Sequence, residues 1–410
     1  MNPYPWRGPL SRLTGGLLVL LLAGFLLVGM SVLLGGVAGL APRPLLQVEL
    51  RDQPPLAGLL LQTEVTHLDL LTGIDAGRVR WQRLPREQVM SISEPTAACA
   101  ASNAEGELLV QSPCTADPQR WQLAFPNDGR WLAGLGRWYD SLRNFLLAPA
   151  RADGQGGISA ALVGTFVLVL LMTLLVLPFG VAVGLYLAEF AGTTRHTRWL
   201  RQVLAQLAAI PSVVYGLVGL GLFVHGFGHQ IDQWFHADRL PSPTYASGGL
   251  LWASLVLALL TLPLVVVVSE QGFRRVPGGL REASLALGAT RSETIFGVLL
   301  PAARPALLTA LILAIARASA EVAPLLLVGA VRYAAQLPIS TEAPFLHLER
   351  PFMHLGYRVL DLATSAGGHT LAVQQAFACA LALLLLVLAL NGAAIYARAI
   401  LRLRHEKLSP

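Results

Sequence analysis

Two charged residues, Arg317 and Glu321, interrupt a long apolar stretch of this chain. An arginine offers a planar fork of N–H donors that stays charged and suits an oxyanion, and a glutamate four residues later in a helix can pair with it. A charge at the centre of a membrane-spanning helix costs at least about 2.5 to 3.5 kcal/mol, so such residues face an interior or a pathway. We expect this pair to face the interior of a helix bundle or a pathway; a structural ion pair between subunits is the alternative.

The elements that carry this pair are apolar runs. With 54% hydrophobic and only 13% charged residues among 410, the chain is not an ordinary soluble domain. A helix of about 20 apolar residues crosses the roughly 30 Å hydrocarbon core. Six runs reach that length, and they predict an all-α polytopic protein with six transmembrane helices: 17–40, 158–188, 203–225, 249–268, 307–331 and 371–397. The first is too long for a signal peptide, so we expect an uncleaved anchor.

The orientation follows from the basic residues. They concentrate before the first run and in alternate loops after it, namely Arg7, Arg12, Arg195, Arg198, Arg201, Arg274, Arg275, Arg281, Arg291, Arg304, Arg398, Arg402, Arg404 and Lys407. The positive-inside rule therefore predicts that both termini are cytoplasmic. This topology accounts for the net charge of +6, so we expect membrane lipid and no nucleic acid among the partners.

The loop between the fourth and fifth runs, 270–305, contains several sequence signals for helix ends and turns close together. Residues 280–287 predict a short helix that stops at Gly288, because glycine takes the left-handed conformation at little cost. Thr290 and Glu293 fit a capping box that starts a second helix, and Pro301 with Pro305 marks the next boundary. We expect helix, sharp turn and helix to form a cytoplasmic docking element; a plain connection between spans is the alternative.

The segment 41–157 differs from the rest, because it is polar and rich in tryptophan. Alternation over residues 63–70 and the turn signal at 126–129 predict a small β-rich domain outside the cytoplasm, with a helix beginning near Trp131. Cys99 and Cys114 lie here and could form a disulfide, whereas Cys379 reads as a small apolar residue of the last span. The sequence contains neither a metal-binding pattern nor a nucleotide-binding loop, so we expect no metal site and no catalytic residue.

These observations predict four parts. Residues 1–40 would form a cytoplasmic N-terminus with the first transmembrane helix, and 41–157 the inserted domain. Residues 158–397 would form a core of five transmembrane helices that includes the loop 270–305, and 398–410 a cytoplasmic tail.

The loop resembles the EAA pattern, EAA-x3-G-x9-I-x-LP, of ABC importer permeases. The matching positions, with Ser284 in place of an alanine and Val298 in place of an isoleucine, are Glu282, Ala283, Ser284, Gly288, Val298, Leu300 and Pro301. The resemblance implies a type I, MetI-like permease fold. It also implies that these residues couple the chain to a cytoplasmic ATPase.

Further segments resemble the A-type permease subunit of phosphate-specific ABC importers. They are Leu177-Pro178-Phe179-Gly180, Ile210-Pro211-Ser212-Val213-Val214-Tyr215-Gly216-Leu217 and Ala314-Ile315-Ala316-Arg317-Ala318-Ser319-Ala320-Glu321-Val322-Ala323-Pro324. The resemblance implies that Arg317 and Glu321 serve phosphate movement, with Arg317 guiding the anion and Glu321 neutralising Arg317 between ions. Ala320 and Val322 depart from the Gly and Thr usual at these two positions, and the insert 41–157 is not covered.

The resemblance implies half of the pathway of an ATP-driven phosphate importer in a bacterial inner membrane. Its partners would be a second homologous permease, two ATP-binding subunits and a periplasmic phosphate-binding protein; the chain itself would bind no cofactor, because the ATPase uses the ATP. A permease for another oxyanion or small solute remains an alternative. A membrane sensor that uses the insert and an ion-coupled transporter are further ones, although neither would need an ATPase dock.

Overall fold

The structure is a computed structural model that describes most of the chain. The chain forms two compact units. The described residues are 9–40, 45–51, 55–63, 67–75, 78–93, 99–102, 108–111, 122–124, 131–150, 156–192, 194–239, 241–341, 343–365 and 370–406. The first unit comprises residues 1–148 and 359–381, and the second comprises 149–358 and 382–410. Each is described by itself.

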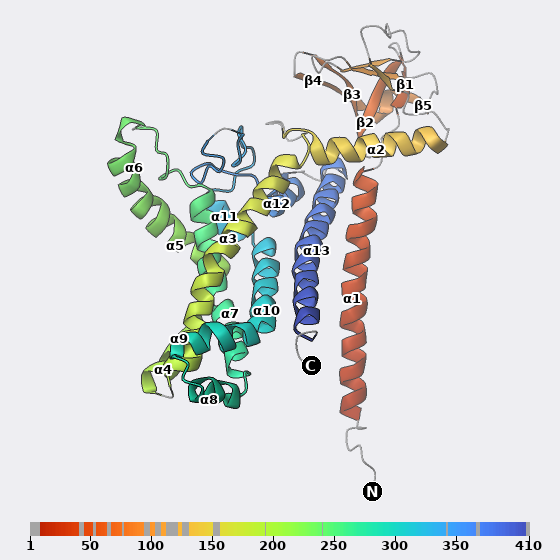
Figure 1. Ribbon diagram of the computed structural model, residues 1–410. Helices are drawn as coiled ribbons and strands as arrows, with labels where there is room; N and C mark the ends of the chain where they lie inside the picture. Colours follow the sequence, from red (N-terminus) through yellow and green to blue (C-terminus); the bar gives the residue numbers. More distant parts are fainter. Residues whose placement is uncertain are drawn as a thin grey trace. The chain divides into compact units, whose positions relative to one another are not determined.

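An antiparallel sheet forms much of the first unit (Figure 1). Its strands are β1 (Leu45–Leu50), β2 (Leu56–Thr63), β3 (His67–Asp75), β4 (Arg78–Pro85), β5 (Val89–Ser93), β6 (Cys99–Ser102), β7 (Leu108–Gln111) and β8 (Gln122–Ala124), with a short 3-10 turn η1 (Arg86–Gln88). The order is β5-β1-β2-β3-β7-β6-β8, and β4 pairs with β3. Along β1, Val48 and Leu50 are buried while Glu49 between them is exposed, as expected for one apolar sheet face. The expected β-rich insert is thus present.

The alternating stretch 63–70 belongs to two strands, since β2 ends at Thr63 and β3 begins at His67. The predicted turn at 126–129 lies outside the described residues. The helix expected near Trp131 is α2 (Trp131–Leu147).

Close glycine contacts join two helices of the first unit, α1 (Pro9–Leu40) and the first part of α13 (Thr370–Glu406). A Cβ at Gly36 would lie 2.7 Å from Leu381 Cδ2, and one at Gly39 would overlap the carbonyl oxygen of Gln374. Small residues of this kind let membrane helices approach closely, which substitutes for the missing hydrophobic driving force. The two glycines therefore fix the contact between α1 and α13.

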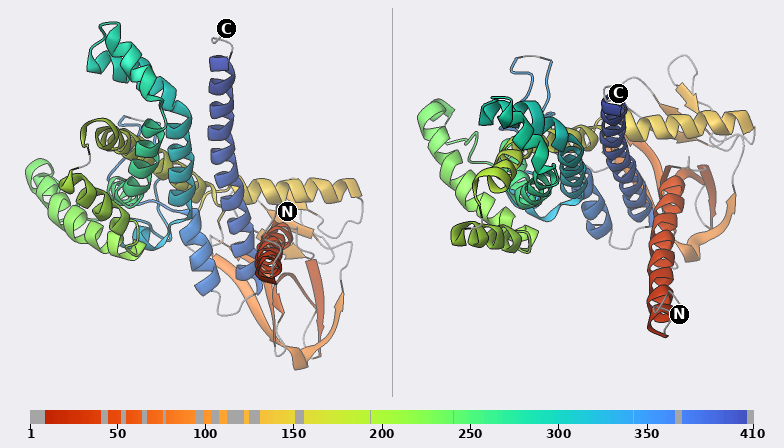
Figure 2. Two further views of the ribbon diagram at one scale, coloured as in Figure 1. Left: turned by 90° about the horizontal axis from the view of Figure 1, so that it is seen from below. Right: turned by 60° about the horizontal axis from the view of Figure 1, so that its bottom comes forward.

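The second unit is helical. Its elements, with π-helical segments η2, η3 and η5 and a 3-10 turn η4, are α3 (Ser159–Leu185), η2 (Tyr186–Phe190), α4 (Arg195–Leu207), α5 (Ser212–Val218), η3 (Gly219–Gly228), α6 (His229–Phe235), η4 (Ala237–Arg239), α7 (Leu250–Arg274), α8 (Gly278–Ala286), α9 (Arg291–Thr294), η5 (Ile295–Leu299), α10 (Leu300–Ala320), α11 (Ala323–Val328), the start of α12 (Leu355–Ser365) and the rest of α13. α3, α7 and α10 lie side by side, and α4, α8 and α9 gather at one end of them (Figures 1 and 2). A Cβ at Gly180 would lie 2.5 Å from Val265 Cγ1, so α3 and α7 are in close contact.

Five helical runs among the described residues are long and apolar enough to cross a membrane: Ser159–Phe190, Ser212–Phe235, Leu250–Arg274, Arg291–Ala320 and Val373–Tyr396. The helix α1, of 32 residues, supplies the sixth predicted element. The prediction of a helical polytopic protein with a small β-rich insert is confirmed.

Two predicted boundaries are wrong. Residues 203–210 belong to α4 and the turn after it, and the third span starts at Ser212, directly after Pro211, which cannot donate a helical hydrogen bond. Pro301 and Pro305 do not end a helix, because the helical run continues from Arg291 to Ala320. The π-helical segment η5 precedes Pro301, and such a segment shifts the hydrogen-bond register where a proline removes a donor.

The fifth span also ends earlier than the apolar run 307–331 indicated. α10 stops at Ala320, Glu321 has extended backbone with φ −83° and ψ 128°, and α11 begins at Ala323. Pro324 lies in the first turn of α11, where the missing N–H leaves no helical hydrogen bond unmade, so it is compatible with a new helix start but not with a continuous helix from α10. The interruption at Glu321 and Val322 is called the break below.

Candidate functional site: a docking loop and a charged helix break

The loop between α7 and α10 has the turn that its sequence predicts. Gly288 has φ +88°, and the N–H groups of Gly288 and Ala289 donate to the carbonyls of Leu285 and Ser284 at 3.0 and 3.2 Å. This pair of bonds is a Schellman motif, which ends a helix with a left-handed residue. The predicted capping box is present as well: Glu293 N–H donates to Thr290 Oγ1, and Thr290 N–H donates to the Glu293 carboxylate at 2.7 Å.

A hydroxyl pair joins the two arms of this loop. Ser284 Oγ on α8 lies 2.9 Å from Thr294 Oγ1 at the end of α9, and Thr294 is buried. An alanine at position 284, as in the EAA pattern, would lack this bond. Ser284 is therefore a substitution that strengthens the loop rather than a defect in it.

An ion pair ties the loop to the end of the second span. Arg281 on α8 donates from Nη2 to Glu189 Oε1 at 2.7 Å and from Nε at 3.1 Å, while it also donates to the carbonyls of Phe273 and Val276. Glu189 lies in η2, and both side chains are largely buried, at 24% and 17% exposure. Charge-assisted bonds of this kind are about twice as strong as neutral ones. The loop is thus held against η2.

A second charged cluster holds α4. Glu270 Oε1 accepts from Arg201 Nε at 2.8 Å and from Arg274 Nε at 2.9 Å, and Arg201 also donates to the Leu187 carbonyl at 3.0 Å. Glu270 is buried on α7, and Arg201 comes from α4. The cluster joins α4, α7 and η2, so both ion-pair systems converge on η2.

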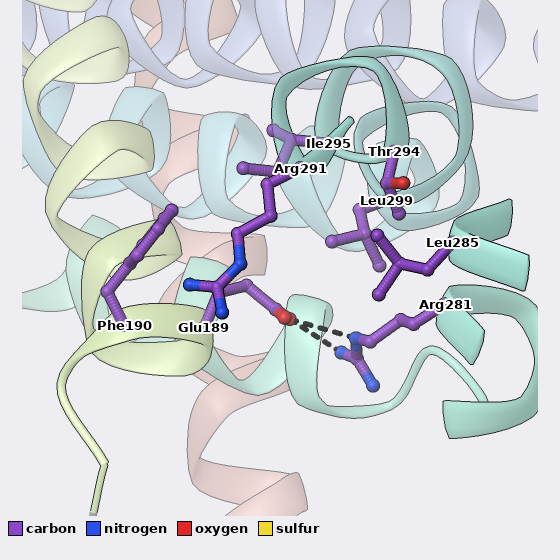
Figure 3. Close-up of a pocket in the computed structure, with 8 residues that line it drawn as sticks. All are labelled: Glu189, Phe190, Arg281, Leu285, Arg291, Thr294, Ile295 and Leu299. Carbon is purple, nitrogen blue, oxygen red and sulfur yellow. Dashed lines mark hydrogen bonds and ion pairs between the residues drawn. The ribbon is translucent and has the colours of Figure 1, made fainter. Parts of the chain in front are cut away.

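A pocket of about 220 Å³ lies between η2 and the loop. In Figure 3 the Arg281 guanidinium points at the Glu189 carboxylate, and Arg291 extends from α9 toward η2. The remaining lining residues are Phe190, Leu285, Thr294, Ile295 and Leu299. The pocket combines an apolar lining with one charged edge.

The outer surface of the loop is apolar at several points. Leu287 is 89% exposed and Phe296 is 72% exposed, and Leu280 and Leu285 are exposed as well. Of the pattern residues, Glu282 and Ala283 are exposed on α8, whereas Val298, Leu300 and Pro301 are partly buried at the base of the loop. A rigid loop that presents exposed apolar side chains has the character of a docking surface.

The charged pair lies at the break. Arg317 Nε is 3.8 Å from Glu321 Oε1, with the side chains 35% and 20% exposed. This distance is too long for a hydrogen bond, and Arg317 Nε has no hydrogen-bond partner in the part of the chain that the structure describes. Glu321 is no longer helical, so the pair spans a helix end rather than one helix face as the four-residue spacing had indicated.

The structure gives less information about the cysteines and about a possible metal site. The structure describes the backbone of Cys99 in β6, but Cys114 lies outside the described residues, and the disulfide stays a prediction. Cys379 is buried in α13, as expected for a small apolar residue of the last span. No cluster of metal-ligating side chains occurs among the described residues.

Sequence reasoning missed the two ion-pair systems. Both combine residues from separate helices, and only the excess of arginines in the loop and in α4 hinted at them. Their acidic partners, Glu189 and Glu270, each stand alone near the end of an apolar run, which was the available signal.

The known proteins that this chain resembles are permease components of transport systems. Residues 180–404 match the family described as "Binding-protein-dependent transport system inner membrane component". The "Probable ABC transporter permease protein YqgI" of Bacillus subtilis is 33% identical over 216 residues, which cover 51% of this chain and 67% of that protein. The "Phosphate transport system permease protein PstA" of Xylella fastidiosa (strain 9a5c) is 36% identical over 173 residues, covering 42% of this chain and 54% of that protein.

The chain thus spans between about half and two thirds of the length of these relatives. Among solved structures, an inward-facing form of the MetNI methionine ABC transporter matches with 19% identity and a TM-score of 0.41, covering 60% of this chain and 94% of that one.

Proposed function

The chain belongs to the family of binding-protein-dependent transport system inner membrane components, and from this premise we propose that it is the permease subunit of an ATP-driven phosphate importer. The family comprises the non-catalytic, multi-pass inner-membrane components of ABC transporters, in which the ATPase is a separate subunit. What we propose beyond the family is the substrate of this chain, its partners and its orientation in the membrane.

The docking loop supports coupling to an ATPase. Its exposed Leu287 and Phe296 offer an apolar surface, and the Arg281–Glu189 pair gives that surface a rigid connection to the second span. A cytoplasmic ATPase that closes on ATP would move α8 and, through Glu189, the end of the second span. In this proposal, Glu282, Ala283, Ser284 and Gly288 form the docking helix and its turn, and Val298, Leu300 and Pro301 form its base.

The observation that carries the choice of an anion is the guanidinium of Arg317 at the break. It holds a permanent positive charge in the last turn of α10, with its side chain 35% exposed, and its only described ionic partner, Glu321, is 3.8 Å away. A loosely paired arginine is able to exchange its carboxylate for a passing oxyanion, which it holds through two parallel N–H bonds. The phosphate permeases among the relatives make phosphate the first substrate to test.

The proposal includes the assembly. Two permeases would enclose the pathway, two ATPase subunits would dock on their loops, and a periplasmic phosphate-binding protein would deliver the substrate. Both termini would then be cytoplasmic and residues 41–157 periplasmic. Single cysteines placed in the insert of a variant lacking the native cysteines should react with an impermeant maleimide in whole cells, and labelling only after permeabilisation would contradict this orientation.

The functional experiment is reconstitution of the chain with these partners in proteoliposomes. Phosphate-loaded binding protein should stimulate ATP hydrolysis and phosphate uptake, whereas sulfate should do neither. If another oxyanion or solute gave the stimulation, the chain would be a permease with a different substrate. Uptake without ATP hydrolysis would indicate an ion-coupled transporter, and a complex without any uptake would favour the sensor.

A further inference from the structure

The helix α2 of the insert has an exposed apolar face. Residues three and four positions apart share one side of a helix, and Leu135, Trp138, Tyr139 and Leu142 recur at this spacing. The side chain of Leu135 is 59% exposed and that of Tyr139 is 64% exposed, and Trp138 is exposed as well. This face therefore offers aromatic and aliphatic surface to something outside the described chain.

The opposite side of α2 is polar, and the sheet of the same unit does not cover the apolar side. Asp140 and Asn144 lie on the polar side and are exposed. Within the part of the chain that the structure describes, the apolar cluster of the sheet includes no residue of α2; it consists of Leu46, Val48, Leu50, Leu68, Leu70 and Leu84. The helix is thus amphipathic without supplying a face to that core.

A hydrogen bond places α2 at the end of α1, which belongs to the same unit. The hydroxyl of Ser141 donates to the Leu40 carbonyl oxygen at 2.9 Å, one of the carbonyls that a helix end leaves unpaired. At this point α2 runs crosswise to α1, and most of the sheet lies further out along the axis of α1 (Figure 1). The helix α2 therefore lies between the end of α1 and the sheet.

The end of α1 marks one surface of the membrane. About 20 helical residues cross the roughly 30 Å hydrocarbon core, and the apolar run 17–40 exceeds that length by a few residues. Along α1 the side chains of Leu26, Leu34 and Val37 are exposed, as lipid-facing residues would be. Leu40 consequently lies at the boundary between the hydrocarbon and the headgroups, and the bond from Ser141 holds α2 at the same level.

An amphipathic helix at this level and crosswise to a span fits the bilayer surface. Such a helix lies in the membrane plane with its apolar face among the upper parts of the acyl chains and its polar face in water. Tryptophan and tyrosine are enriched at this depth, because their rings are apolar while their N–H or O–H group reaches water. Trp138 and Tyr139 on α2 have this character.

We propose that α2 lies in the membrane surface on the side of the insert, with Leu135, Trp138 and Tyr139 in contact with lipid acyl chains. The helix would hold the sheet of the insert close to the bilayer. This role goes beyond the proposed function and does not depend on which substrate the transporter carries.

Spin labels on single cysteines test the lipid contact in the full-length chain. After replacement of the native cysteines, Leu135→Cys and Tyr139→Cys place the label on the apolar face, and Asp140→Cys and Asn144→Cys are the matched controls on the polar face. The chain is reconstituted in vesicles of phosphatidylethanolamine and phosphatidylglycerol. Oxygen concentrates in lipid, whereas a nickel chelate stays in water.

The measured quantity is the ratio of label relaxation by oxygen to relaxation by the nickel chelate. We expect this ratio to be at least about fivefold higher at positions 135 and 139 than at positions 140 and 144. Equal ratios at all four positions would overturn the proposal. Labels at 135 and 139 that neither reagent reaches would overturn it as well, because a protein surface would then cover the face.

Photolabelling of the unmodified chain covers the case in which a labelled variant does not insert. The same vesicles then contain a phospholipid with a diazirine near the start of its acyl chain, and mass spectrometry locates the adducts after irradiation. We expect adducts on α1 and on the apolar face of α2, with fewer on Asp140 and Asn144. Adducts on α1 with none on α2 would refute the proposal.

Discussion

Arg281 Nη2 lies 2.7 Å from Glu189 Oε1, although the two residues are 92 positions apart in the sequence. The pair joins the docking loop to η2, the π-helical end of the second span. Since Arg281 also donates to two carbonyls at the end of α7 and the turn after it, one guanidinium ties three elements together. The loop and the second span are therefore directly connected.

Arg281→Gln should weaken this connection. Loss of one partner leaves the Glu189 carboxylate largely buried without its cation, and hydrogen bonds to charged groups contribute about 1.5 to 3 kcal/mol. We expect a lower thermal midpoint and reduced ATP-driven uptake in reconstituted complexes. Arg291→Gln, a change in the same loop at an exposed arginine without that bond, is the matched control. Equal behaviour of the two variants would show that the tie is unimportant.

Gly288→Val should uncouple transport without preventing membrane insertion. Gly288 has φ +88° with no atom within 4 Å of an added Cβ, so the penalty is backbone strain, about 1 to 2 kcal/mol. Gly279→Val introduces the same side chain into open space without positive φ, and Gly288→Asn tolerates the left-handed region; both should retain coupling. Phosphate uptake and copurification of the ATPase are the measurements. Normal uptake by Gly288→Val would reduce the loop to a simple connection.

Gly39→Ala should destabilise the contact between α1 and α13. The added Cβ would overlap the Gln374 carbonyl oxygen and lie 3.2 Å from the Ala378 Cβ, and overpacking typically costs about 1 to 3 kcal/mol. Gly29→Ala in the same helix meets no atom within 4 Å and should leave the thermal midpoint unchanged or slightly raised. Midpoints measured in detergent test the difference, and identical values would mean that the two helices do not depend on this contact.

Stability should fall on acidification because of His354. The pKa of His354 in the folded protein is about 4 because burial disfavours the charged ring, whereas the pKa of a histidine in the unfolded chain is about 6.5. Between these values the unfolded state binds the proton more readily, so stability is full above about pH 6.5 and decreases toward pH 4. His354→Asn should lessen this decrease, while His229→Asn, at an exposed histidine, should leave it unchanged. Equal acid profiles would contradict the assignment.

The parts predicted well from the sequence are those that depend on local rules. Long apolar runs indicated the spans, and Gly288 with Thr290 and Glu293 indicated a turn whose bonds lie within a few residues. The charged pair was also found, because an arginine inside an apolar run is conspicuous.

The parts missed depend on packing between segments or on backbone register. The partner of Arg281 is set by how the loop folds back on η2, which hydrophobic periodicity does not report. The π-helical segment η5 allowed the helix to continue through Pro301, and the helix break at Glu321 lies in a stretch that is apolar on both sides. His354 gave no signal at all, because its importance arises from complete burial.

The central claim is that Arg317 guides phosphate, and the most direct test is phosphate uptake by complexes carrying Arg317→Ala, Arg332→Ala, or Arg317→Ala together with Glu321→Ala. Removing Arg317 alone deletes the cation and leaves Glu321 without its partner, so uptake should be abolished. Arg332→Ala, at an exposed arginine beyond α11, should reduce uptake at most in part.

The double variant separates the two roles of the pair. It removes both charges, so a complex in which the pair is only structural should assemble and recover much of its transport. Our account predicts that the double variant assembles with its ATPase yet imports no phosphate. Substantial phosphate import by an assembled complex that lacks both charged side chains would contradict it.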